Sequence, residues 1–164
     1  NSEKKKHIIV SSGNDVDNIE IVSQILAVGK NVKIYVQIEN RSLRYFHKEN
    51  GLLQGSNITL YSYSEDASRE LFEKYDIDGK SNEILSSNDE YSIVILGNTN
   101  LSYEVIFQAC IIGQLPNENK LTIYCLDKNP KKFQQKVELN YTEIHNVPNV
   151  EIKYIKFDMD SKIS

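Results

Sequence analysis

The sequence is poor in cysteine and proline, with two Cys and three Pro among 164 residues. Two cysteines cannot build the disulfide framework of a small secreted domain, and their spacing fits no metal-binding motif. A chain of this length buries roughly two thirds of its unfolded surface, so it folds without a disulfide or a metal. Cys110 and Cys125 both lie inside apolar patterns. We therefore expect two small, buried, hydrophobic side chains.

Long hydrophobic runs are also missing. The longest, such as 92–96, have the length of a strand and fall far short of the roughly 18 residues that a membrane helix needs. The first six residues contain no apolar segment typical of a signal peptide, and no initiator Met, so we expect a piece cut from a longer protein. A net charge of −4 and a pI of about 5.4 argue against a nucleic-acid partner.

Familiar catalytic motifs are absent from the sequence. It contains no Gly-x-Ser-x-Gly turn, no His-Glu-x-x-His helix and no phosphate-binding loop ending in Gly-Lys-Ser/Thr. The three histidines, His7, His47 and His145, fall in three different segments. The sequence therefore predicts that the chain is not an enzyme.

Strand-like and helix-like periodicities alternate along the chain. Short β-branched runs predict six strands, at residues 7–12, 32–38, 57–63, 91–96, 121–126 and 150–157. Helical spacing predicts helices near residues 15–28, 42–50, 64–75, 101–113 and 130–139. Ser64 is the expected cap of the third helix, and the continuous run Ile8–Val10 indicates a strand buried on both faces. This alternation predicts an α/β protein with a doubly wound parallel sheet.

Residues 76–90 interrupt the alternation with a polar, turn-rich stretch. We expect residues 1–78 to form one half-domain, 79–90 to connect and 91–164 to form a second half-domain. Two sites with the chemistry to bind a ligand come directly after strands in these halves.

The stronger candidate is the loop Gly97–Ser102, which joins a strand to a helix. In a dinucleotide-binding unit such a helix N-terminus holds phosphate, and an acid at the end of the next strand binds ribose. We expect the amides of Asn98, Thr99, Asn100 and Leu101 to meet phosphate, and Asp127 to meet a ribose. Thr99 and Ser102 replace the second and third glycines of Gly-x-Gly-x-x-Gly. The alternative is a unit of the same shape that no longer binds a dinucleotide.

The weaker candidate is the stretch Ser11, Ser12 and Gly13 with Asp15, which also joins a strand to a helix. Small hydroxyls, a glycine and exposed amides suit an anion or a ribose. The alternative is simple capping of the helix by Asn14 or Asp15, which needs no ligand.

These residues resemble a known family. Gly13, Asp15 and Asn18 match a Thr-Gly-Asp-Asp-x-x-Asn stretch of the RCK domain, also called the TrkA N-terminal domain. Residues 7–75 resemble the back half of such a domain, and residues 91–158 resemble the front half of a second one. Gln37 stands where family members often have Arg.

The resemblance implies a Rossmann-like fold and a nucleotide-binding role in regulating potassium channels or transporters. The two halves would then complete one six-stranded sheet of order 3-2-1-4-5-6, as a circular permutant. Its crevice would lie between the Gly97 loop and Ser11–Gly13. We expect the strands at 8–12 and 92–96 to be parallel neighbours, within one chain or exchanged between two.

The predicted function is a cytoplasmic regulatory domain at the membrane, joined to a pore domain and forming a homo-oligomer. The expected ligand is NAD, another adenine nucleotide or a small anion. Asp127 favours NAD over NADP by repelling a 2′-phosphate, although the neighbouring Lys128 weakens that preference. Two alternatives remain open: a fragment of an NAD(P)-dependent Rossmann oxidoreductase, and a scaffold that oligomerises without a ligand.

Overall fold

The computed structural model describes residues 6–28, 32–50, 53, 55, 57–75, 90–114 and 120–158. Within them the fold is α/β, with two three-stranded parallel sheets and five α-helices. The chain divides into two compact units, unit 1 up to Asp66 and unit 2 from Ala67 onward. The division falls inside one helix. Residues 76–89, which include the predicted connector 79–90 except for its last residue, lie outside the described residues, so the predicted half-domain boundaries stay a prediction.

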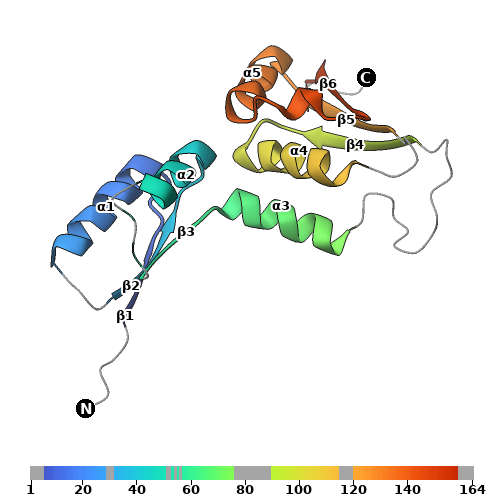
Figure 1. The fold of residues 1–164 in the computed structure, drawn as a ribbon. Helices are drawn as coiled ribbons and strands as arrows, with labels where there is room; N and C mark the ends of the chain where they lie inside the picture. Colours follow the sequence, from blue (N-terminus) through green and yellow to red (C-terminus); the bar gives the residue numbers. More distant parts are fainter. Residues whose placement is uncertain are drawn as a thin grey trace. The chain divides into compact units, whose positions relative to one another are not determined.

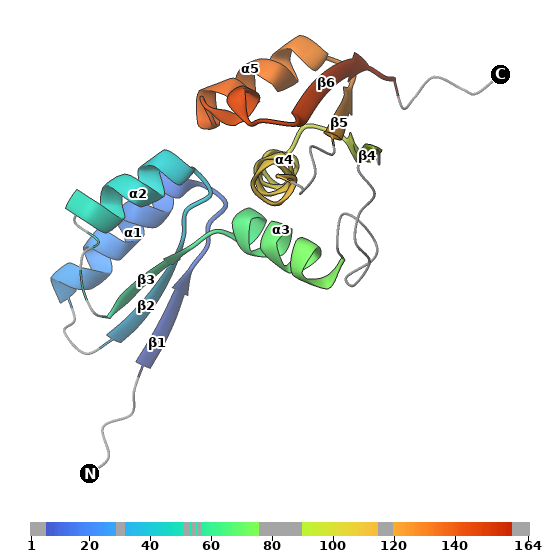
Figure 2. The ribbon, with the colours of Figure 1, turned by 45° about the vertical axis from the view of Figure 1, so that its right-hand side comes forward.

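Unit 1 alternates strands and helices around a sheet of order β1-β2-β3, all parallel (Figure 1). Its elements are β1 (Lys6–Val10), α1 (Asp15–Val28), β2 (Val32–Gln37), α2 (Arg41–Asn50), β3 (Ile58–Tyr61) and the start of α3 (Tyr63–Lys74). Figure 2 shows α1 and α2 on the same side of this sheet. Their apolar side chains pack against alternate strand residues, among them Val10, Ile34 and Val36.

Unit 2 repeats the pattern with a sheet of order β4-β5-β6, again all parallel. Its elements after α3 are β4 (Glu90–Leu96), α4 (Asn100–Ile112), β5 (Lys120–Asp127), α5 (Pro130–Asn140), a 3-10 turn (Ile144–Asn146) and β6 (Val150–Lys156). Phe133 lies at the centre of its core, fully buried against the rings of Tyr103 and Tyr154. Cys110 and Cys125 are buried and free, as predicted.

Three details differ from the sequence-based expectations. The first strand covers 6–10 and ends two residues before Ser12. The third strand ends at Tyr61, and Tyr63 belongs to α3. The cap of α3 is accordingly not Ser64: the amide of Glu65 donates to Ser62 Oγ at 3.2 Å. The helix begins early because a carboxylate from the loop after β2 accepts from its first amides.

Burial of the first strand on both faces was also wrong within unit 1. Ile9 is 71% exposed, whereas Val10 is buried. The described helices of unit 1 pack against the other face of the sheet, so Ile9 has no cover there. Among the described residues, none of the helices combines the length and hydrophobicity that a bilayer crossing requires.

Candidate functional site: two strand-to-helix loops

Each unit places a glycine turn at the carboxyl end of its first strand. Gly13 comes after β1 with φ 89°, and Gly97 comes after β4 with φ 92°. This left-handed conformation is comfortable for glycine and strained for other residues. A Cβ at either position would meet open space, so the backbone angle is what requires glycine there. In each unit the turn leads directly into the N-terminus of a helix.

In unit 2 the turn is held by a reciprocal cap. Ser102 N donates to Thr99 Oγ1 at 3.2 Å, and Thr99 N donates to Ser102 Oγ at 3.4 Å. The hydroxyl of Tyr103 donates to Asn98 Oδ1. The residues that replace glycines of the dinucleotide motif thus cap α4. Among the described residues, no hydrogen bond uses the amides of Asn98, Asn100 or Leu101.

Asp127 lies next to this turn, because β4 and β5 are paired in register. Leu96 is opposite Leu126, and Gly97 N donates to Leu126 O at 3.0 Å. Asp127 Oδ1 accepts from Asn129 N at 2.7 Å. Within the described part of the chain, Asp127 Oδ2 accepts no hydrogen bond. Lys128 turns to Asp158 at 3.5 Å, in an exposed ion pair. The structure therefore brings together the turn and the acid that the sequence singled out.

In unit 1 the residues predicted to contact a ligand hydrogen-bond to other residues of the chain. Ser11 Oγ donates to the Gln37 side chain, and Ser12 N donates to Asn18 Oδ1 at 2.7 Å. Asn14 caps α1, since its side chain accepts from Val16 N at 2.8 Å. The Asn14 bond is the one expected from the alternative interpretation, in which the helix is capped without a ligand.

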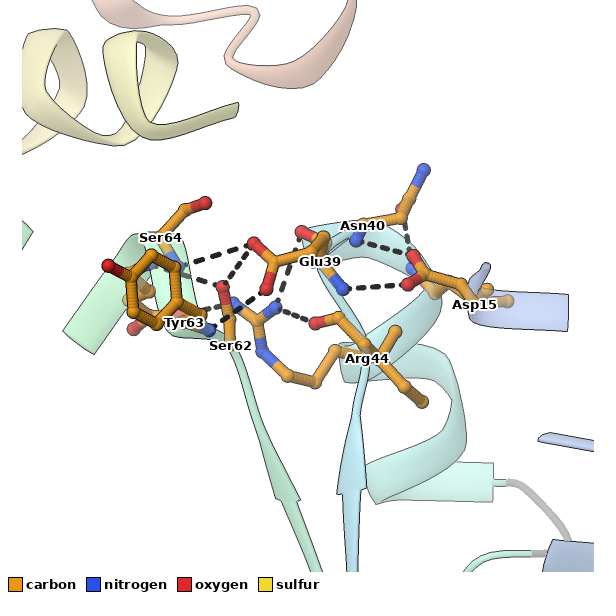
Figure 3. A network of polar contacts seen from close by, with 10 residues as sticks. Asp15, Glu39, Asn40, Arg44, Ser62, Tyr63 and Ser64 are labelled. Atoms are coloured by element: carbon orange, nitrogen blue, oxygen red, sulfur yellow. Dashed lines mark hydrogen bonds and ion pairs between the residues drawn. The ribbon is translucent and has the colours of Figure 1, made fainter. Parts of the chain in front are cut away.

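Asp15 does not cap its own helix. Its carboxylate accepts from the amides of Glu39 and Asn40, at 2.9 and 2.7 Å, and so holds the loop between β2 and α2 (Figure 3). Asp15 is thus engaged with the backbone of a neighbouring loop rather than open to a ligand.

Sequence reasoning missed the residue at the centre of this edge, Glu39. Its carboxylate accepts from Ser62 Oγ at 3.1 Å, Tyr63 N at 2.9 Å and Ser64 N at 3.3 Å (Figure 3). Burial by itself would raise the pKa of Glu39. Hydrogen bonds from Gln37 and from the first turn of α3 outweigh it, and the pKa lies below its ordinary value.

Arg44 completes the network from α2. Its guanidinium donates to the carbonyls of Ile38 and Glu39 and pairs with Glu65, in a contact that is largely buried (Figure 3). One signal in the sequence pointed to this network. Glu39 comes two residues after the end of β2, and Ser62 comes directly after the end of β3. These two strands are parallel neighbours, so their carboxyl ends meet at one edge of the sheet.

The predicted crevice between Ser11–Gly13 and the Gly97 loop involves both units, and it stays a prediction. Compared with protein-family models, with curated proteins and with solved structures, the chain shows no match.

Proposed function

We propose that the chain is a ligand-sensing regulatory module whose ligand, an adenine nucleotide such as NAD, binds to unit 2. The observation that carries this proposal is the adjacency of the Gly97 turn and Asp127. Amides at a helix N-terminus attract phosphate, and a carboxylate on the next strand accepts from ribose hydroxyls. Asn98, Asn100 and Leu101 supply amides outside the helix cap, and Asp127 Oδ2 supplies an acceptor.

The remaining parts of the proposal come from the resemblance alone. They are a potassium channel or transporter as the parent protein, a pore domain and a second copy as partners, and a place at the cytoplasmic face of the membrane. In such a protein the ligand would act by binding one arrangement of the module more tightly than another, and its differential affinity would shift the gate. Potassium flux through the full-length protein in vesicles, with and without NAD, tests this part.

The experiment on the site compares two acids of unit 2. NAD and ADP are titrated calorimetrically into the wild type, Asp127→Ala and Asp158→Ala. We expect Asp127→Ala to weaken NAD binding by at least about tenfold, because a charged acceptor contributes roughly 1.5–3 kcal/mol. Asp158→Ala removes an exposed charge and should bind as the wild type does. Equal affinity in all three proteins would remove Asp127 from the site.

A scaffold without a ligand is the second candidate, because one observation favours it. In the loop of unit 1, Ser11, Ser12 and Asp15 already hydrogen-bond to other residues of the chain, so one of the two predicted ligand sites has a purely structural explanation. A thermal-shift panel of nucleotides separates the two candidates. A ligand at about 100 times its Kd adds roughly 2.7 kcal/mol of stability. Absence of a shift with every nucleotide would favour the scaffold.

We further propose that the edge strands β1 and β4 pair in one six-stranded sheet. Both strands end their own sheets, and both carry exposed apolar residues: Ile9 is 71% exposed and Val94 is 59% exposed. Such edges invite pairing. The resulting order β3-β2-β1-β4-β5-β6 is the doubly wound order 3-2-1-4-5-6, whichever half is counted first.

Paired cysteines test this sheet. Ile9→Cys and Val94→Cys are combined in a chain whose Cys110 and Cys125 are replaced by Ala, and the protein is oxidised gently. A cross-link within the monomer supports the sheet. A cross-linked dimer indicates that β1 is exchanged between two copies, and failure to cross-link contradicts the pairing.

A further inference from the structure

Three side chains of unit 1 form a continuous run of hydrogen bonds. Ser11, in the loop after β1, donates through its hydroxyl to Gln37 Oε1 at the end of β2. The amide of the same Gln37 donates through Nε2 to Glu39 Oε1 at 2.8 Å. Glu39 then accepts from the first turn of α3. We call Ser11, Gln37 and Glu39 the relay.

The last member of the relay satisfies the start of α3. The first amides of a helix have no partner inside the helix, and a carboxylate there also interacts favourably with the helix dipole. Glu39 takes the amides of Tyr63 and Ser64, while Ser62 Oγ takes that of Glu65 and itself donates to Glu39. The position of the Glu39 carboxylate therefore decides whether the first turn of α3 is capped.

The first member of the relay lies in an exposed loop. Ser11 is exposed, and its hydroxyl orients the Gln37 amide so that Nε2 points to Glu39. A change that removes the Ser11 hydroxyl frees the Gln37 amide to turn, and a turned amide no longer donates to Glu39. Glu39 is partly buried, and a buried carboxylate that loses a donor is less well placed to accept from Tyr63 and Ser64.

From these contacts we infer that the relay couples the Ser11–Gly13 loop to the first turn of α3, so that a change at Ser11 alters how firmly that turn is held. The coupling is reciprocal, because a looser first turn also weakens the hold on Ser11. This inference goes beyond the proposed nucleotide site, since it lies in unit 1 and needs no ligand at the Gly97 loop. The helix that receives the effect is the one in which the chain passes from unit 1 to unit 2.

Hydrogen exchange of the full chain, followed by mass spectrometry, tests the coupling. The segment to follow is 63–68. Exchange should become at least about tenfold faster in Glu39→Ala, which removes the charged acceptor itself, and about two- to fivefold faster in Gln37→Ala and Ser11→Ala. Gln37→Ala removes both side-chain bonds of the relay, and Ser11→Ala removes the first of them. An effect of Ser11→Ala or Gln37→Ala on segment 63–68 would have to pass through Glu39, because no hydrogen bond of the described residues joins Ser11 or Gln37 to α3 directly.

Two controls separate the relay from general loosening. Gln24→Ala breaks an exposed bond to Glu20 on α1 and should leave segment 63–68 unchanged. Thr99→Ala opens the cap of α4 and should speed exchange at 100–105 while leaving 63–68 unchanged. Circular dichroism verifies that each variant is folded, and the exposed Ser11→Ala keeps the test decisive if Glu39→Ala unfolds unit 1.

The coupling would be overturned if segment 63–68 exchanged at the wild-type rate in Ser11→Ala and Gln37→Ala but faster in Glu39→Ala. Glu39 would then be a local cap of α3 and nothing more. Faster exchange spread evenly over both units in Ser11→Ala would overturn the coupling as well. Nucleotide binding at the Gly97 loop is unaffected by either result, so this inference and the proposed function fail separately.

Discussion

The two units build the same strand–turn–helix start and use it differently. Each has a left-handed glycine after its first strand and an acid at or just after the end of its second strand, Glu39 in unit 1 and Asp127 in unit 2. In unit 1 the acid is saturated by the first turn of α3. In unit 2 one oxygen of the acid holds a single backbone amide. An acid at this edge of the sheet thus serves as a structural cap in one unit and has an unused acceptor atom in the other.

This difference shows why a loop and an acid at the right spacing do not by themselves make a binding site. In unit 1 the element after the third strand makes the difference. The helix that follows β3 begins at the carboxyl edge of the sheet and supplies amides to Glu39. Variants that act on one unit at a time can test the comparison.

The largest effect should come from the core of unit 2. Phe133→Ala removes a fully buried ring and should lower the free energy of unfolding by about 3–5 kcal/mol. Both thiols of the chain belong to unit 2, and burial raises the pKa of each to about 12, so native thiols label slowly. Labelling should become at least about a hundredfold faster in the variant.

Leu139→Ala, on the same helix but 80% exposed, is the matched control and should label at the wild-type rate. Hydrogen exchange of β2 in the same samples sharpens the comparison. If the two units share one sheet, as proposed, β2 loses protection together with unit 2. If the cysteines label fast while the amides of β2 keep their wild-type protection, the two units unfold independently.

A smaller effect should come from the ion pairs, which the two units also use differently. Arg44→Met removes the guanidinium from a largely buried pair and from two carbonyls, and should cost unit 1 about 1.5–3 kcal/mol, the range for hydrogen bonds of a charged group. Lys128→Met breaks an exposed pair in unit 2 and should cost at most about 1 kcal/mol. Urea unfolding measures both, and equal costs would contradict the assignment of the buried network to unit 1.

Effects of about the same size in both units should come from the glycine turns, where the units ought to agree. Gly13→Ala and Gly97→Ala each force a side chain into a left-handed backbone and should each cost about 1–2 kcal/mol. Open space around both positions leaves backbone strain as the common cause. The two midpoints in urea should shift alike. A cost confined to one glycine would show that the turns are not equivalent.

Local patterns in the sequence were enough to predict most of the secondary structure. Pro130 marks the start of α5, which is confirmed, because proline suits the first turn of a helix. The end of β3 could not be predicted in this way. Tyr63 has the β-propensity of a strand residue, but Glu39 captures its amide and places it in a helix.

The same limit applies to the candidate site. Gly97 and Asp127 are joined by strand register, which is set by two apolar runs and is therefore predictable. Whether the side chains of Ser11 and Asp15 are hydrogen-bonded or open depends on partners 24 to 26 residues away, so no local sequence pattern predicts it. What distinguishes the two loops is tertiary hydrogen bonding.

The early cap of α3 also carries a consequence for the order of folding. A 12-residue helix is marginal in water by itself, and α3 receives its cap from a residue 24 positions earlier in the chain. Closing that loop costs entropy before any bond is gained, so β2 and β3 must pair before the first turn of α3 becomes stable. During synthesis Glu39 leaves the ribosome well before Tyr63. The acceptor is therefore in place when the helix emerges, and the amides of α3 become protected only after those of the sheet that precedes it.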